Sequence, residues 1–239
     1  MTSVLDKCKA FMIDHIFTNR CPFCGEFIRW DFYLCKACED KLVRANKSIC
    51  RKCGKSKCLC AENSCHRNYD AVFATFFYKD EKVRDAICGL KIDGETNIAL
   101  AAADDTAKYI KSEGMKLPDA VVPVPMGKKK RFKRGHNQAE IFAKCFGKIF
   151  GIPVIKNALY KYDTKEEQHN NSREERERRV NYLFHAKNAD LTGMTILLCD
   201  DVMTTGATLN RCALLLKNLG AEAVIVAVCA VTELETTIG

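Results

Sequence analysis

Residues 196–208, from Ile196 to Thr208, read ILLCDDVMTTGAT and carry the strongest fold signal in the sequence. The first four of them form an uninterrupted apolar run, which predicts a strand that is buried on both faces. Asp200 and Asp201 follow at once, and a small polar loop comes after them. The leucines between residues 209 and 219 then recur at helical spacing until Gly220 ends the helix. The stretch therefore predicts a strand, an acidic pair, a loop and a helix.

The loop and the acidic pair together suit a sugar phosphate. The loop consists of Thr204, Thr205, Gly206, Ala207 and Thr208. A loop that enters a helix offers unpaired backbone N–H groups and the positive end of the helix dipole, both of which favour a phosphate. Asp200 and Asp201 are placed to accept hydrogen bonds from vicinal hydroxyls, so we predict a ribose 5-phosphate site. The alternative is a strand that merely ends in two acids before a helix capped by Thr208.

Length and composition bound the class of protein. The chain has 239 residues, of which 47% are hydrophobic, enough for one large domain and a small module. No window approaches the roughly eighteen apolar residues of a membrane span, and the N-terminus lacks the features of a signal peptide. We therefore expect a cytoplasmic protein. Ten of the fifteen cysteines precede residue 66, and without an export signal this clustering favours metal binding over disulfides.

The cysteines fall into two sets. In the first, Cys21 and Cys24 form one CxxC knuckle and Cys35 and Cys38 form another, a spacing that strongly predicts a tetrahedral zinc site. The second set begins with Cys50 and Cys53, and we assign Cys58 and Cys60 as its other pair, although spacing also allows Cys65. One zinc ion is predicted, and a second is left open. Because four thiolates and one Zn²⁺ carry a net charge of −2, two such sites would lower the formal +8 to about +4.

Aromatic residues lie between the two knuckles of the first set, with Arg29 and Lys36 nearby. They are Phe23, Phe27, Trp30, Phe32 and Tyr33. Aromatic and basic side chains in this arrangement can stack on single-stranded nucleic acid and neutralise it. They can equally form the miniature core of a zinc ribbon. We expect most of them to be core, and nucleic-acid binding stays open.

The remaining pattern predicts the domain organisation. Helices are expected over residues 4–17, 82–90, 98–111 and 137–150, and strands over 69–78, 120–125, 153–156, 194–199 and 223–232. From residue 120 onward strands and helices alternate, which predicts an α/β fold with a mostly parallel sheet and flanking helices. We place a helix and a cysteine-rich module at residues 1–66 and the α/β domain at residues 67–239.

A dense basic run follows the strand expected at residues 120–125. Six of the seven positions from 128 to 134 are Lys or Arg, so the run predicts a site for phosphate or another polyanion. The residues assigned to that site are Met126, Gly127, Lys128, Lys129, Lys130, Arg131, Lys133 and Arg134. The alternative is a solvated basic loop. Residues 160–181 mix six acidic with six basic side chains, which is typical of a mobile flap or a solvated helix, and a helix is favoured for 173–179.

Several stretches, in matching order from about residue 20 to 232, resemble the ComF (ComFC) family of competence-associated, phosphoribosyltransferase-like proteins. They are the paired CxxCG knuckles, Val122-Pro-Val-Pro125, Arg134-Gly-His-Asn-Gln138, residues 164–168 and 178–181, and CDDVMTTGAT. The chain departs from the family at His136, where phenylalanine is usual, and in its compressed second cysteine set.

The resemblance implies a type I phosphoribosyltransferase fold behind an N-terminal double zinc ribbon. Asp200 and Asp201 would be the catalytic pair that holds the ribose hydroxyls of phosphoribosyl pyrophosphate, and residues 204–208 would hold its 5-phosphate. The turn after Pro125, with the basic run, would face the pyrophosphate. Residues 168–181, including Gln168, Arg178 and Asn181, would form the flexible loop. Mg²⁺ would accompany the ligand, bridging pyrophosphate and ribose oxygens.

The family also implies a role in natural transformation. The protein would handle incoming single-stranded DNA, with competence and recombination proteins as its partners. The alternative is an active phosphoribosyltransferase that transfers phosphoribosyl to a nitrogen acceptor, although no motif names that acceptor. A third interpretation treats the zinc module as an assembly surface for a partner protein.

Overall fold

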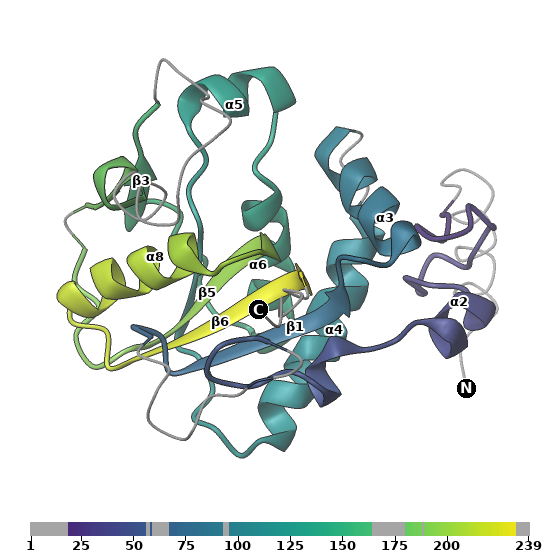
Figure 1. Cartoon of the computed structure of the whole chain (residues 1–239), viewed down its shortest axis with the longest axis horizontal. Coiled ribbons are helices and arrows are strands. Elements are labelled where there is room, and N and C mark those ends of the chain that lie inside the picture. Colours follow the sequence, from purple (N-terminus) through teal and green to yellow (C-terminus); the bar gives the residue numbers. More distant parts are fainter. Residues whose placement is uncertain are drawn as a thin grey trace, which may run out of the picture.

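Four parallel strands form the sheet on which the molecule is built (Figure 1). In spatial order they are β1 (Ala71–Phe77), β6 (Ala223–Val231), β5 (Thr195–Met203) and β2 (Ala120–Pro123). Each neighbouring pair is parallel, and most residues of these strands are buried, as expected for a sheet covered on both faces. The computed structural model describes residues 19–55, 58, 67–92, 96–163, 180–187 and 189–232. The predicted helix at residues 4–17 lies outside these residues.

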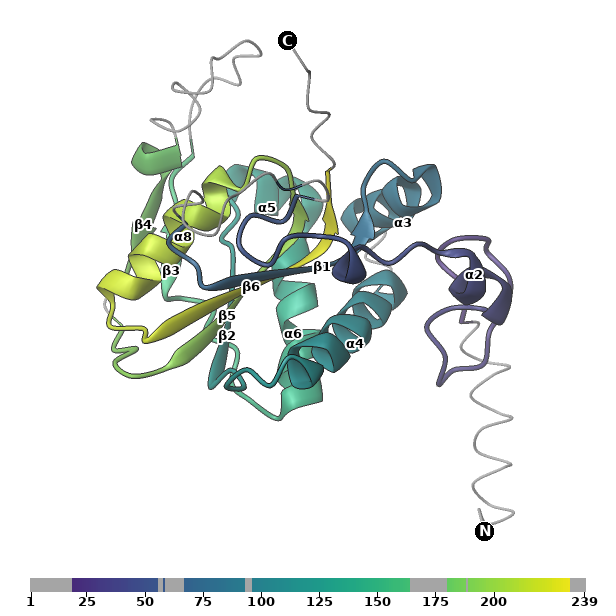
Figure 2. The ribbon, with the colours of Figure 1, turned by 60° about the horizontal axis from the view of Figure 1, so that its bottom comes forward.

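Helices cover both faces of the sheet (Figure 2). On one face, α3 (Glu81–Ile92), α4 (Asn97–Ser112) and α6 (Gln138–Phe150) share a core with Leu197 and Cys199 of β5. On the other face, α8 (Ala207–Asn218) shares a second core with Ile196 and Leu198. The alternation along β5 therefore divides its apolar run between two cores. The predicted α/β fold class is confirmed.

The outer edge of β1 is covered by the cysteine-rich part of the chain. The N–H of Val72 donates to the Arg51 carbonyl at 2.7 Å, and the N–H of Ala74 donates to Asn46 Oδ1 at 3.0 Å. The short helix η1 (Ala45–Lys47) carries Asn46, and α2 (Lys36–Lys41) precedes it in the chain. Pairing an edge strand in this way satisfies donors that would otherwise be exposed. The domain boundary at residues 66 and 67 stays a prediction.

The opposite edge of the sheet departs from the expected pattern. The strand predicted at residues 153–156 is reduced to an isolated bridge between Val121 and Val154, because the chain turns away at residues 156 and 157. Beyond that turn, β3 (Leu159–Lys161) and β4 (Phe184–Ala186) form an antiparallel ribbon. The ribbon was not predicted, because each strand is short and lies in or beside a stretch of mixed charge.

The three internal helices predicted at residues 82–90, 98–111 and 137–150 are confirmed as α3, α4 and α6. Asn137 caps α6, since its Oδ1 accepts the N–H of Ala139 at 3.2 Å. The basic run is itself a helix, α5 (Lys128–Arg134), which buries none of its residues. Among the described residues, no helix has the length and apolar character needed to cross a bilayer.

Candidate ribose-phosphate site and metal centres

The acidic pair lies inside β5 and not after it. We expected the strand to end at Cys199, but β5 continues to Met203 because its pairing with β6 extends beyond the acids. Asp200 Oδ1 accepts the N–H of Asp201 at 2.9 Å, and Asp201 Oδ1 accepts the N–H of Val202 at 2.8 Å. These short local bonds orient both carboxylates at the carboxyl end of the sheet, where open α/β sheets bind their ligands.

The polar loop after β5 is shorter than predicted. Thr204, Thr205 and Gly206 connect the strand to α8, whereas Ala207 and Thr208 already belong to the first helical turn. Gly206 has φ +77°, a conformation that side chains disfavour, and it directly precedes the helix. Thr205 Oγ1 accepts the N–H of Ala207 at 3.4 Å. The N-terminus of α8 and the exposed residues Thr204 and Thr205 thus lie next to each other, an arrangement that suits a phosphate.

Both acids of the pair are half-buried, and this raises the cost of ionising Asp200. Desolvation, followed by the neighbouring charge of Asp201, raises the pKa of Asp200 well above its usual range. Lys161 of β3 opposes this shift, which places a cation near the carboxylate. A carboxylate that is costly to ionise in the ligand-free protein gains most from a hydrogen-bond donor or a cation. Lys161 had no distinguishing signal in the sequence, because it lies in the mixed-charge stretch.

The basic run lies beside the acidic pair. The N–H of Val124 donates to the Cys199 carbonyl at 2.8 Å, so the turn that follows Pro125 starts next to Asp200, which is still within β5. Arg131 forms a bidentate ion pair with Glu140 at 2.7 and 3.2 Å, and the N–H of Lys129 donates to Asp163. The predicted pyrophosphate residues therefore start next to the ribose residues and then extend outward on α5 (Figure 1).

A cavity of about 360 Å³ lies between α5 and the β3–β4 ribbon. Of the basic run and its preceding turn, Met126, Lys128 and Arg131 line it, and Tyr160 and Lys161 line it from the ribbon. The loop at residues 204–206 does not belong to its lining. Lys161 thus links the cavity to the acidic pair. The predicted flexible-loop residues Gln168 and Arg178 lie outside the described residues, whereas Asn181 is exposed beside β4.

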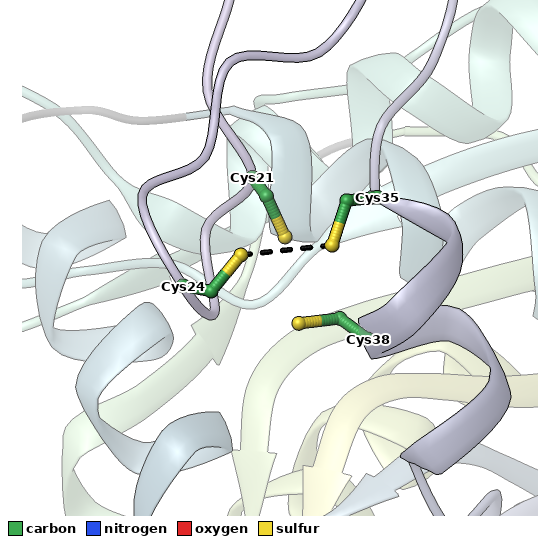
Figure 3. Close-up of side chains that lie close together, drawn as sticks. All are labelled: Cys21, Cys24, Cys35 and Cys38. Atoms are coloured by element: carbon green, nitrogen blue, oxygen red, sulfur yellow. Dashed lines mark hydrogen bonds between the residues drawn. The ribbon is translucent and has the colours of Figure 1, made fainter.

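The first cysteine set forms a complete ligand cluster (Figure 3). The sulfur atoms of Cys21, Cys24, Cys35 and Cys38 lie within 4.8 Å of one another. Cys24 Sγ and Cys35 Sγ are 3.6 Å apart, close to the edge of about 3.8 Å that Zn–S bonds of about 2.3 Å give in a tetrahedron. Four thiolates at this spacing fit Zn²⁺.

The protonation of these thiols differs within the cluster. Burial opposes ionisation of Cys21, but hydrogen bonds from the backbone, chiefly at Cys35 and Phe23, lower its pKa overall. Burial raises the pKa of Cys38, and the other thiols of the cluster raise it further. One cysteine is thus predisposed to be a thiolate, while another requires a cation before it ionises.

The second set brings together Cys50, Cys53 and Cys58, whose sulfur atoms also lie within 4.8 Å of one another. Burial raises the pKa of Cys53 to about 11, whereas backbone hydrogen bonds lower that of Cys50 against the effect of its burial. Three thiols so arranged fit a metal with one ligand still to be supplied. Cys60, which we assigned as that ligand, and the alternative Cys65 lie outside the described residues.

The aromatic residues of the first knuckle pair are less buried than predicted. Phe23 is buried and packs edge-on against Phe76 of β1 at 5.6 Å. Phe27, Trp30 and Phe32 are exposed, at 60%, 50% and 49%, so the expectation that most of the five are core is wrong. These rings are exposed because the module is too small to enclose them. Its interior is occupied by the cluster of cysteines instead of a hydrophobic core. Arginines cover two of the exposed rings: Arg20 lies over Phe27 at 3.8 Å and Arg29 over Phe32 at 4.9 Å.

Comparison with known families agrees with this geometry. A model of the phosphoribosyl transferase domain matches residues 95–236, and a model of the double zinc ribbon domain matches residues 12–68. Among solved structures, a purine phosphoribosyltransferase from Pyrococcus horikoshii Ot3 aligns with a TM-score of 0.35 and 22% identity, covering 56% of this chain and 70% of that one.

Two curated relatives extend the comparison. The chain is 26% identical to competence protein ComFC of Bacillus subtilis over an alignment of 208 residues, and this alignment covers 81% of each protein. It is 32% identical over 111 residues to competence protein F of Haemophilus influenzae, covering 45% of this chain and 48% of that protein. This chain therefore matches about half the length of the second relative. The match to the transferase domain covers more than half of the chain, and together with the zinc-ribbon match and these relatives it assigns the protein to the ComF/ComFC family of phosphoribosyltransferase-like proteins.

Proposed function

We propose that this protein binds phosphoribosyl pyrophosphate at the carboxyl end of its sheet. Asp200 and Asp201 accept hydrogen bonds from the ribose hydroxyls, and residues 204–208 hold the 5-phosphate. The turn after Pro125 and the basic residues that follow it face the pyrophosphate. One observation carries the proposal: the Val124 to Cys199 hydrogen bond brings the basic turn alongside the acidic pair, so cations and diol acceptors meet at one edge.

Magnesium fits the same proposal, because carboxylate and phosphate oxygens are the ligands that it prefers. When bound, it would neutralise charge on the pyrophosphate. Asp200 and Asp201 would lie nearest to it, and a cation there would stabilise the ionised form of Asp200, whose pKa is raised by burial and then by the charge of Asp201. The chain's own residues would orient the sugar. The N–H of Val202 fixes the Asp201 carboxylate by a hydrogen bond, and Lys161 offsets part of the negative charge of Asp200.

The test is calorimetry of phosphoribosyl pyrophosphate with Mg²⁺. We compare the wild type with a variant that carries both Asp200→Asn and Asp201→Asn. The substitutions preserve shape and remove the charge, so we expect binding to the wild type and at least a hundredfold loss in the variant. Thermal unfolding serves as the control for folding. Equal binding by both proteins, or none by the wild type, would refute the ribose-phosphate site.

We further propose that the protein acts in natural transformation by handling single-stranded DNA, since two of its relatives are competence proteins. Helix α5 supports this proposal, because every residue of it is exposed and Phe132, at 94%, projects among its cations. Basic side chains neutralise phosphates and an exposed ring can stack on a base.

Oligonucleotide binding at low salt tests this role. We expect Lys129→Glu with Lys133→Glu to weaken binding and to flatten its dependence on salt, because fewer counterions are released. Phe132→Ala should weaken binding by about fivefold without changing the salt slope, since a stacking contact contributes about 1 kcal/mol or more. If the wild type bound no oligonucleotide at low salt, the DNA-handling role would lose its physical basis.

The cavity between α5 and the β3–β4 ribbon favours a second function. A volume of about 360 Å³ beside Lys161 has room for a small acceptor close to the acidic pair. The protein would then be a phosphoribosyltransferase that acts on a nitrogen nucleophile. A screen for pyrophosphate release across bases and amines separates this enzyme from a binding protein, because the binding protein yields no product.

A further inference from the structure

Met203 lies between the second cysteine cluster (Cys50, Cys53 and Cys58) and the proposed ribose-phosphate loop. Met203 is the last residue of β5 and is buried. A Cβ atom placed on Gly54, next to Cys53, would lie 2.8 Å from Met203 Cε, and one placed on Gly206 would lie 3.1 Å from the same atom. One methionine side chain is therefore in contact with a glycine of the cluster and with the glycine of the loop.

Tyr69 makes a second connection between the same two features. Its side chain is 4% exposed, and its hydroxyl has no hydrogen-bond partner among the described residues. A Cβ atom on Gly206 would lie 3.7 Å from that hydroxyl, so the group is directed toward the loop. Desolvation raises the pKa of Tyr69 to about 12, although the charge of Arg67 opposes this shift. At neutral pH the hydroxyl is therefore a protonated donor that faces the loop.

The chain just before β1 is fastened to the same loop and to α8. Asn68 donates its backbone N–H to Asn210 Oδ1 at 2.8 Å, and its side-chain amide to the Asn210 carbonyl at 3.3 Å. Arg67 reaches the Thr205 carbonyl at 3.5 Å. Asn210 in turn donates its N–H to Gly206 at 2.8 Å. These contacts leave little room for the loop to move without Tyr69 and its neighbours.

We propose that Tyr69 and Met203 position the ribose-phosphate loop, and that a metal in the cluster of Cys50, Cys53 and Cys58 holds them in place. The proposal rests on the proposed function, because it concerns the affinity of that same loop. A buried hydroxyl without a partner destabilises the ligand-free protein, and it gains a partner when the loop tightens around a phosphate. Phosphate affinity thus depends on the second cluster and not on the first.

Tyr69→Phe tests the hydroxyl alone, because the ring and its packing remain. We expect ribose 5-phosphate to bind about fivefold more weakly, the effect of one neutral hydrogen bond. Zinc content should be unchanged, and the melting temperature without ligand should stay the same or rise. A residue with a merely structural role would instead lower the melting temperature. Wild-type affinity in a folded Tyr69→Phe variant would overturn the role of the hydroxyl.

A matched pair of cysteine variants tests the dependence on metal. Cys50→Ser with Cys53→Ser should lose zinc from the second cluster and bind ribose 5-phosphate at least tenfold more weakly. Cys35→Ser with Cys38→Ser should lose zinc from the first cluster and bind within twofold of the wild type. Equal affinity in the two variants would overturn the inference. If the wild type itself bound no ribose 5-phosphate, the proposed function would fall, and this inference with it.

Discussion

The two cysteine clusters begin with the same CxxCG sequence, yet they relate to the rest of the molecule in different ways. The first cluster holds together its own loops and reaches the sheet through Phe23, which packs on Phe76. The second lies on the edge of β1 and against the end of β5, where Gly54 meets Met203. The motif therefore specifies a metal knuckle, while its neighbours decide whether that knuckle affects the proposed ligand site.

A metal would contribute differently to the two cysteine regions. In the first region, residues 19–42 contain a small set of buried side chains, so the metal has to replace a hydrophobic core. In the second region, hydrogen bonds from Val72 and Ala74 hold residues 46 and 51 to the sheet without a metal. We infer that the first cluster depends on zinc for its fold, whereas the second depends on it for its exact position.

Removal of zinc should give the largest effect and the sharpest contrast. A structural zinc site contributes on the order of 10 kcal/mol to the fold of its module. After treatment with a strong chelator, we expect residues 19–42 to lose protection from hydrogen exchange, while the amides of Val72 and Ala74 keep theirs. Exchange measured by mass spectrometry, with zinc release followed by a dye, reports both regions in one sample. Loss of protection in both regions together would show that they form one unit.

Phe76→Ala tests how the first region is attached. Phe76 belongs to β1, is fully buried and packs against Phe23 of the first knuckle pair, so truncation should cost about 3–5 kcal/mol. Urea unfolding measures the loss. Phe132→Ala is the control, because Phe132 is 94% exposed and its truncation should change stability by less than about 0.5 kcal/mol. A small effect at Phe76 would mean that the packing against Phe23 contributes little.

Pattern and spacing predicted the parts of the molecule that depend on local sequence. Uninterrupted apolar runs located β5 and β6, helical spacing located α4 and α6, and the two knuckles located the first ligand cluster. These predictions are correct because burial on both faces, helical periodicity and tetrahedral coordination each require a recognisable residue pattern within a short segment of the chain.

The features that sequence reasoning missed depend on contacts between distant segments. Tyr69 read as the first residue of a strand, and nothing near it in the chain indicates that its hydroxyl faces Gly206. The helical state of residues 128–134 was not predicted, because a dense run of like charges lacks the apolar spacing by which a helix is recognised and indicated only a polyanion site. The exposure of Trp30 and Phe32 followed from the small size of the module, which spacing does not report.

Two asparagines give a smaller, paired test. Asn46 is 1% exposed and accepts the N–H of Ala74, so Asn46→Ala leaves that buried donor unpaired and should cost about 1–3 kcal/mol. Asn19 donates to the Phe32 carbonyl at 2.9 Å in the first region, where the acceptor residue is exposed. Water can replace that bond, so Asn19→Ala should cost less than about 1 kcal/mol. If chemical unfolding showed a larger loss of stability for Asn19→Ala than for Asn46→Ala, this view of the two regions would be contradicted.

The smallest expected difference is in ligand affinity, between variants of the two glycines that close the knuckles. Gly25 has φ +72° and Gly54 has φ +75°, so alanine at either position meets the same backbone strain of about 1–2 kcal/mol. Their surroundings differ: a Cβ atom on Gly25 would meet nothing within 4 Å, whereas one on Gly54 would meet Met203. The pair therefore isolates the contact with Met203 from the cost of the backbone conformation.

We expect Gly25→Ala and Gly54→Ala to have similar melting temperatures, because a flexible methionine can move aside at little cost. The difference should appear in ligand binding, since Met203 moves toward Gly206 when it yields. Calorimetry with ribose 5-phosphate should show a loss of about threefold for Gly54→Ala and no loss for Gly25→Ala, a difference of about 0.6 kcal/mol. Equal affinities would mean that the loop tolerates displacement of Met203, and Tyr69 would then carry the connection to the second cluster alone.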